Sequence, residues 1–94
     1  MRQRAARRDK NEPEIIKALR DAGASVVQLD DAGIPDLLVG YGNVTMLVEV
    51  KSEKGNLTPP QATFFANWKG QACVVRTIQD VERLLAGIAT ETVL

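Results

Sequence analysis

Two acidic residues and a lysine in the segment 33–51 could do chemistry together. Glu49 and Lys51 interrupt an apolar run where a buried strand normally carries valine or isoleucine, and Asp36 follows a proline thirteen residues before Glu49. Because side chains alternate along a strand, Glu49 and Lys51 must point to the same face of a sheet. Asp36 reaches them if the two apolar runs pair. Carboxylates beside a lysine suit a hard cation, and magnesium and manganese prefer such oxygen ligands.

Two interpretations of this charged cluster remain open. Two carboxylates brought within about 4 Å repel each other by roughly 4 kcal/mol at an effective dielectric constant near 20, so a positive charge must lie between them. Lys51 alone could supply that charge in a structural ion pair. Buried ion pairs seldom stabilise a fold more than apolar packing does, and this favours a functional cation site.

The residue types that the chain lacks exclude several kinds of chemistry. It contains no histidine and one cysteine, which excludes a serine triad with a histidine base, a zinc site of cysteines and histidines, and an intrachain disulfide. The cysteine, Cys73, lies in the apolar stretch Ala-Cys-Val-Val, which is typical of a small core residue rather than a nucleophile. Carboxylates and lysine therefore remain as the candidate reactive groups.

Charge is balanced over the 94 residues but is unevenly placed. Twelve basic and twelve acidic residues give a net charge of zero, yet residues 1–10 carry five basic side chains and one acidic one. We expect a basic arm over 1–10, whose Arg4, Arg7 and Arg8 could contact phosphates, and a single domain over 11–94. A solvated, frayed terminus explains the arm equally well. With no apolar run suited to a signal peptide or a membrane span, a cytoplasmic protein is expected.

Helix-capping residues, turn residues and the spacing of apolar residues predict three helices and four strands. The last strand follows a helical crossover and should lie parallel to an earlier strand, whereas the second and third strands should form a hairpin with a turn at 40–43. The predicted class is α/β, with a four-stranded mixed sheet flanked by helices in the order αβββαβα. The predicted elements are a helix at 12–22, strands at 25–29, 36–39 and 44–50, a helix from 58 to about 68, a strand at 72–76, and a helix opened by Thr77 and Asp80.

The first two helices begin with the pattern of a capping box. Asn11 is followed three residues later by Glu14, and Thr58 is followed three residues later by Gln61. Glu12 shares the inward stripe of the first helix, whereas Glu14 does not. That stripe consists of Ile15, Ile16, Leu19 and Ala22.

A Pro-Asp pair, a Glu-x-Lys triplet and a later glutamine follow one another in a specific order. They occur at 33–36 (Gly-Ile-Pro-Asp), at 49–51 (Glu-Val-Lys) and at Gln61, after a first helix. The combination resembles the PD-(D/E)XK nuclease superfamily, and within it the virus-type replication-repair nuclease (VRR-NUC) module of the compact phage and bacterial type. The resemblance covers about residues 12–85 and implies a restriction-endonuclease-like core.

The resemblance implies a metal-dependent enzyme that hydrolyses phosphodiester bonds in DNA. In the family, the acidic residues that match Asp36 and Glu49 bind Mg²⁺ or Mn²⁺, together with the main-chain carbonyl that matches Val50. The lysine that matches Lys51 positions or deprotonates the attacking water. These roles agree with the physics of phosphate hydrolysis, in which a cation and a lysine stabilise developing charge.

The family also places a glutamate of the first helix beside the metal and a glutamine close to the catalytic centre. We assign Glu12 to the site and to the metal because it lies on the inward stripe, and we keep Glu14 as the alternative, since the capping box accounts for it. Gln61 could be catalytic or only a helix cap. Lys54, in the loop after the triplet, could touch a DNA phosphate or be simply solvated.

Substrate and partners follow from the resemblance alone. Some family members of this minimal size resemble Holliday-junction resolvases and act as homodimers, because a two-fold dimer fits a four-way junction. We expect a homodimer that cuts branched DNA in repair or recombination, with a replication or recombination protein as a further partner. The alternatives are a general or flap nuclease, a catalytically silent DNA-binding module of the same fold, and a structural protein in which Glu49 and Lys51 form an ion pair.

Overall fold

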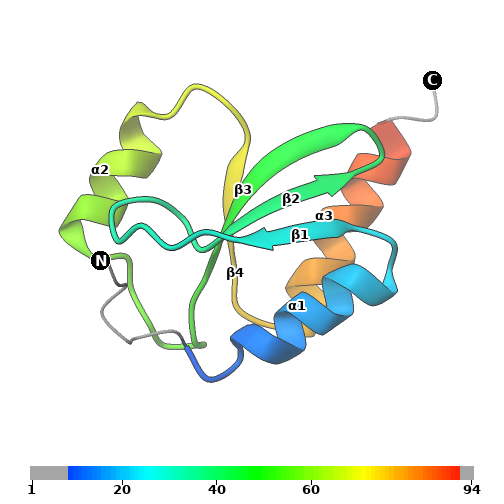
Figure 1. Ribbon diagram of the computed structural model, residues 1–94, viewed down its shortest axis with the longest axis horizontal. Coiled ribbons are helices and arrows are strands. Elements are labelled where there is room, and N and C mark those ends of the chain that lie inside the picture. The colour runs from blue at the N-terminus through cyan, green and yellow to red at the C-terminus, as the bar shows by residue number, and fades with distance from the viewer. Residues whose placement is uncertain (1–8, 92–94) are drawn as a thin grey trace.

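The four strands form one mixed sheet, and the three helices lie on its two sides (Figure 1). The elements are α1 (Glu12–Asp21), β1 (Ser25–Gln28), β2 (Leu37–Tyr41), β3 (Val44–Val50), α2 (Pro59–Asn67), β4 (Ala72–Val75) and α3 (Ile78–Glu91). This computed structural model describes residues 9–91, and within them no helix has the length and apolarity needed to cross a membrane. Strands β1, β2 and β3 pair antiparallel in sequence order, and β4 pairs parallel with β3. The predicted class and element order are confirmed.

A tight turn at Gly42 and Asn43 joins β2 to β3. The φ angles of these residues are 58° and 66°, as in a two-residue type I′ turn, which glycine and asparagine adopt at low cost. The predicted turn over 40–43 is too long, because Gly40 and Tyr41 still belong to β2 and pair with β3. The short turn sets the register of the hairpin.

One face of the sheet packs against α1 and α3 and forms the core. Alternate residues of the strands point to this face, among them Leu37 and Val39 of β2 and Val48 and Val50 of β3, all of them almost completely buried. The helices contribute Ile15, Ile16 and Leu19 from α1, and Val81, Leu85 and Ile88 from α3. Asp36 and Glu49, which alternate with these residues, therefore point to the opposite face.

The start of α1 differs from the prediction. Asn11 occupies the N-cap position, but its side chain makes no capping hydrogen bond, so the predicted Asn11–Glu14 capping box is wrong. Its Nδ2 donates instead to the backbone carbonyls of Lys51 and Arg76, at 3.1 and 2.9 Å. These carbonyls follow the ends of β3 and β4 and need donors from outside the ladder. Ala22, expected on the inward stripe, lies beyond the helix and is exposed.

Helix α2 connects β3 to β4 on the side of the sheet away from α1 and α3 (Figure 1). Its capping box is formed as predicted: Thr58 Oγ1 accepts from the backbone N–H of Gln61, and Gln61 Oε1 accepts from the backbone N–H of Thr58. Gln61 is the buried residue of this helix. Phe64 and Trp68 stack with ring centroids 5.0 Å apart, and Trp68 is 46% exposed. The helix is therefore anchored at its N-terminal end by a polar residue rather than by an apolar stripe.

Adjacent leucines of β2 test the assignment of the two faces. Leu37 is fully buried in the core, whereas Leu38 points to the other face and is 36% exposed. We expect Leu37→Ala to lower the free energy of unfolding by about 2–5 kcal/mol, because it leaves a cavity, and Leu38→Ala to lower it by about 1 kcal/mol or less. Urea denaturation followed by circular dichroism measures both. Equal losses in the two variants would contradict the assignment.

Candidate active site

The pairing of β2 with β3 brings two acidic side chains together. Leu37 pairs with Val48, so Asp36 lies opposite Glu49 one position further along. Both side chains are buried, with residue exposures of 3% for Asp36 and 1% for Glu49. The expectation that the two apolar runs pair, and so place Asp36 beside the Glu-x-Lys triplet, is confirmed.

Pro35 gives the end of the hairpin an unusual hydrogen-bond pattern. Continuing the register by two residues from the Leu37–Val48 pair places Pro35 opposite Val50. Proline has no N–H, so residue 35 cannot donate to the Val50 carbonyl as a regular antiparallel pair would. The N–H of Val50 donates to Asp36 Oδ2 at 2.9 Å. Asp36 is thereby held by β3, the strand that carries Glu49. The carbonyl of Val50 points to the same edge of β3 as its N–H, towards Asp36.

Glu49 is held from two directions by polar side chains. Lys51 Nζ lies 3.6 Å from Glu49 Oε2, and both side chains are largely buried. Gln61 Nε2 donates to the same oxygen at 3.1 Å. The amide oxygen of Gln61 closes the capping box of α2 while its amide nitrogen binds Glu49. The predicted cap is therefore confirmed, and a catalytic use of Gln61 stays a prediction.

Glu12 lies at the first turn of α1, on the other side of the sheet. Glu12 is 1% exposed and accepts a hydrogen bond from Gln28 Nε2 at 3.1 Å, whereas Glu14 is exposed. The inward position predicted for Glu12 is therefore confirmed. Within residues 9–91, no three or more Asp, Glu, Cys or His side chains form a group that could hold a metal. The structure thus does not join Glu12 with Asp36 and Glu49 in one three-carboxylate cluster, and its role at the site stays a prediction.

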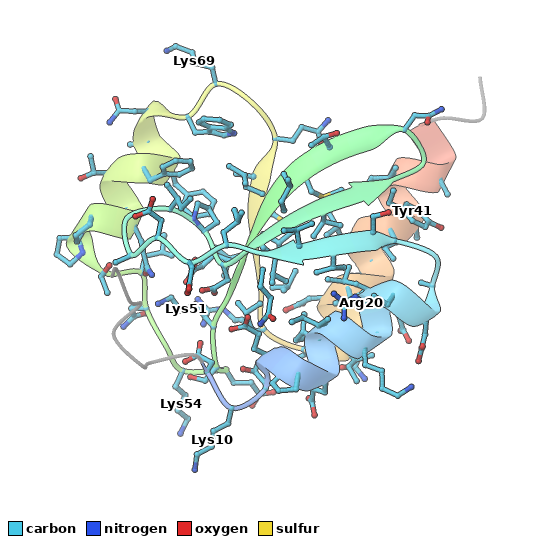
Figure 2. The ribbon with its side chains drawn as sticks, viewed as in Figure 1. Lys10, Arg20, Tyr41, Lys51, Lys54 and Lys69 are labelled. Atoms are coloured by element: carbon cyan, nitrogen blue, oxygen red, sulfur yellow. The ribbon has the colours of Figure 1, made fainter. Side chains whose placement is uncertain are left out.

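Of the predicted DNA-contacting residues, the structure describes Lys54 alone. Lys54 is exposed and projects from the loop that follows Lys51, whereas Lys51 lies within the body of the molecule (Figure 2). Arg4, Arg7 and Arg8 fall outside the described residues.

The lone cysteine has the properties of a structural residue. Cys73 is half-buried and packs against the core. Burial, and to a smaller extent the charge of Asp80, raises the pKa of its thiol to about 11. Because a thiol with such a pKa stays protonated near neutral pH, Cys73 is a poor nucleophile, in agreement with the prediction from its apolar surroundings.

Arg76 is a residue that sequence reasoning missed. Its N–H donates to Asp80 Oδ2 at 2.8 Å, and this bond is the largest cause that lowers the pKa of Asp80. Its guanidinium donates to backbone carbonyls of the loop that follows Lys51. No residue pattern could have revealed that contact, because its acceptors are main-chain atoms more than twenty positions earlier.

Comparison with solved structures finds the same architecture in a known protein. A structure described as "VRR_NUC domain" matches with a TM-score of 0.70 and 26% identity, over 83% of this chain and 97% of that one. This likeness over most of both chains supports a VRR-NUC module. The family indicated by the residues is thus confirmed, and the VRR-NUC module is a nuclease-type domain. No protein-family model and no curated protein matches this chain.

Two glutamates of α1 give a matched test within this VRR-NUC module. Glu12→Gln keeps the size of a buried side chain but removes its charge, and Glu14→Gln makes the same change on the exposed side. If Glu12 supports the site, we expect its variant to lose about 10- to 100-fold in DNA cleavage rate, as loss of an outer partner of a metal site typically does. Single-turnover cleavage assays should show little change for Glu14→Gln. The reverse pattern would assign the role to Glu14.

Proposed function

We propose that this VRR-NUC module is a magnesium- or manganese-dependent DNA endonuclease. The observation that carries the proposal is the pair of buried carboxylates, Asp36 directly before β2 and Glu49 on the neighbouring strand β3, with Lys51 Nζ 3.6 Å from Glu49 Oε2. Burying charged groups is costly unless they are paired or bind a metal. A cation that joins the two carboxylates accounts for their retention in the interior.

The donor groups at this place fit a hard divalent cation. Asp36 and Glu49 offer carboxylate oxygens. The Val50 carbonyl is a third oxygen, on the edge of β3 next to Asp36, and Pro35 has no N–H to donate to it. An all-oxygen set of this kind suits Mg²⁺ or Mn²⁺ and disfavours softer metals. When bound, the cation supplies Lewis acidity and neutralises charge on the phosphate.

Lys51 and Gln61 have complementary roles in this proposal. Lys51 Nζ, fixed beside Glu49, orients the attacking water and stabilises the negative charge that develops on the phosphate. Gln61 Nε2 holds one oxygen of Glu49, which restricts the rotation of that carboxylate. Because Gln61 is itself locked by its capping bond to Thr58, Glu49 is held by the start of α2.

A cleavage assay tests the nuclease activity. Linear duplex, single-stranded and branched DNA are incubated with and without Mg²⁺ or Mn²⁺. We expect cleavage to need the cation and to fall by about 10²- to 10⁴-fold in Lys51→Met, which removes the ammonium but keeps the aliphatic stem. Lys17→Met, a change at an exposed lysine of α1 that pairs with Asp21, is the matched control.

Other outcomes of that assay select other functions. Cation-independent cleavage, or full activity in Lys51→Met, would overturn the proposed mechanism. Binding of DNA without cleavage would select the catalytically silent module. Neither binding nor cleavage would leave Glu49 and Lys51 as a structural ion pair.

We further propose that the substrate is branched DNA, such as a Holliday junction, and that two copies act together. A two-fold dimer presents two sites to a two-fold symmetric junction. Val27 of β1 and Leu38 of β2 pair across the sheet on the face away from α1 and α3, and both are exposed, so a second copy would bury apolar surface there. Recognition of junction shape also agrees with a net charge of zero, which gives only modest attraction to DNA. A general or flap nuclease is the alternative.

Mass and cleavage pattern test this assembly together. We expect light scattering to give twice the mass of one chain, and a four-way junction to be cut at symmetric positions faster than a flap or linear duplex. Val27→Ser with Leu38→Ser should shift the mass towards one chain. A monomeric protein that still cuts junctions symmetrically would contradict the dimer, and equal rates on all substrates would support a general nuclease.

A further inference from the structure

The side chain of Arg76 is bonded to the loop that follows the Glu-x-Lys triplet. Arg76 comes directly after β4 and is half-buried. Its Nη1 donates to the backbone carbonyls of Ser52 and Gly55 at 2.8 and 2.6 Å, and at 3.5 Å to that of Glu53. One guanidinium therefore binds the first and the middle part of loop 52–57.

The bonded loop turns back at Gly55, beside the stem of Lys51. The N–H of Gly55 donates to the Ser52 carbonyl at 3.1 Å, which closes a tight turn. A Cβ added at Gly55 would lie 3.0 Å from Ser52 Oγ and 3.7 Å from Lys51 Cδ. The turn thus lies beside the lysine side chain, close enough that a side chain added at Gly55 would contact Lys51.

The main chain of Lys51 is fixed by groups from two other elements. Its N–H donates to the Val75 carbonyl at 3.0 Å, and its carbonyl accepts from Asn11 Nδ2 at 3.1 Å. Asn11 Nδ2 also donates to the Arg76 carbonyl at 2.9 Å, while the Arg76 N–H donates to Asp80. The main chains of Lys51 and Arg76 are therefore both anchored by hydrogen bonds. The guanidinium of Arg76 in addition anchors the loop.

We propose that Arg76 is a positioning residue: it holds loop 52–57 against Lys51 and so keeps the ammonium beside Glu49. This inference rests on the proposed function of Lys51. A half-buried guanidinium that donates to fixed carbonyls orders a loop at the moment of folding, so the lysine loses little freedom when substrate binds. An arginine that binds DNA phosphate is the competing explanation. Positioning is favoured because the guanidinium already donates to two carbonyls of the loop.

Trypsin provides a readout that does not depend on nuclease activity. The loop contains a trypsin site after Lys54, and the bonded loop should resist cleavage there. We expect Arg76→Gln to speed cleavage after Lys54 by about tenfold or more, since local opening governs proteolysis. Arg83→Gln, at an exposed arginine that pairs with Asp80 and lies on α3, is the matched control and should digest like the wild type. Melting by circular dichroism sets a temperature at which every variant is folded, and Arg76→Lys replaces Arg76→Gln if the latter does not fold.

Kinetics distinguish positioning from phosphate binding. We expect Arg76→Gln to lower kcat by about 10- to 100-fold, the size expected from a misplaced catalytic group, with KM changed by about twofold or less. Arg76→Lys keeps the charge but not the fork of donors, and should recover only part of kcat. The salt dependence of DNA binding should match the wild type in both variants.

Each contrary outcome has a defined meaning. Unchanged cleavage after Lys54, or faster cleavage with an unchanged kcat, would overturn the proposal. A raised KM with a salt slope reduced by about one would assign Arg76 to a phosphate contact instead. If the wild-type protein cleaves no DNA, the proposed function fails, while the trypsin result still decides whether Arg76 holds the loop.

Discussion

Leu37 pairs with Val48 in the β2–β3 hairpin, and the arrangement of the site depends on that register. Because strand side chains alternate, a slip of one residue would turn one strand over relative to the other. Asp36 would then exchange faces with Leu37, or Glu49 with Val48, and a carboxylate would enter the apolar core. The two-residue turn at Gly42 and Asn43 excludes such a slip by fixing the start of the pairing. The position of the carboxylates is therefore a consequence of apolar pairing on the opposite face.

Polar side chains then join separate elements to that hairpin. Gln61 links the start of α2 to Glu49, and Asn11 links the start of α1 to the ends of β3 and β4. Leaving a buried polar group without a partner costs about 1–3 kcal/mol, so each of these bonds restricts where the surrounding elements can lie. Two helices that occupy opposite sides of the sheet are thus tied to the same short stretch of β3 and the residue after it (Figure 1).

Much of the fold could be predicted because local signals agreed with tertiary packing. The apolar run of β3 and the Thr58–Gln61 capping box specify their elements within a few residues, and both occur as expected. The errors lie where a side chain found a distant partner or where a turn was shorter than its composition indicated. Asn11 has the sequence context of a cap, but its amide binds carbonyls forty and sixty-five residues away. Gly40 looked like a turn residue and is part of a strand.

The sequence by itself determined the kind of site. Missing histidines left carboxylates and lysine, and strand alternation placed Glu49 and Lys51 on one face. Tertiary structure decided what surrounds them: the Val50 N–H on Asp36, the two hydrogen bonds of the Gln61 amide, the absence of one cluster that joins Glu12 to Asp36 and Glu49 among the described residues, and the bonds of Arg76 to the loop beside Lys51. The physical reason is that spacing along the chain specifies the direction of a side chain only within its own element. Contacts between elements depend on crossover, register and main-chain acceptors that no residue pattern records.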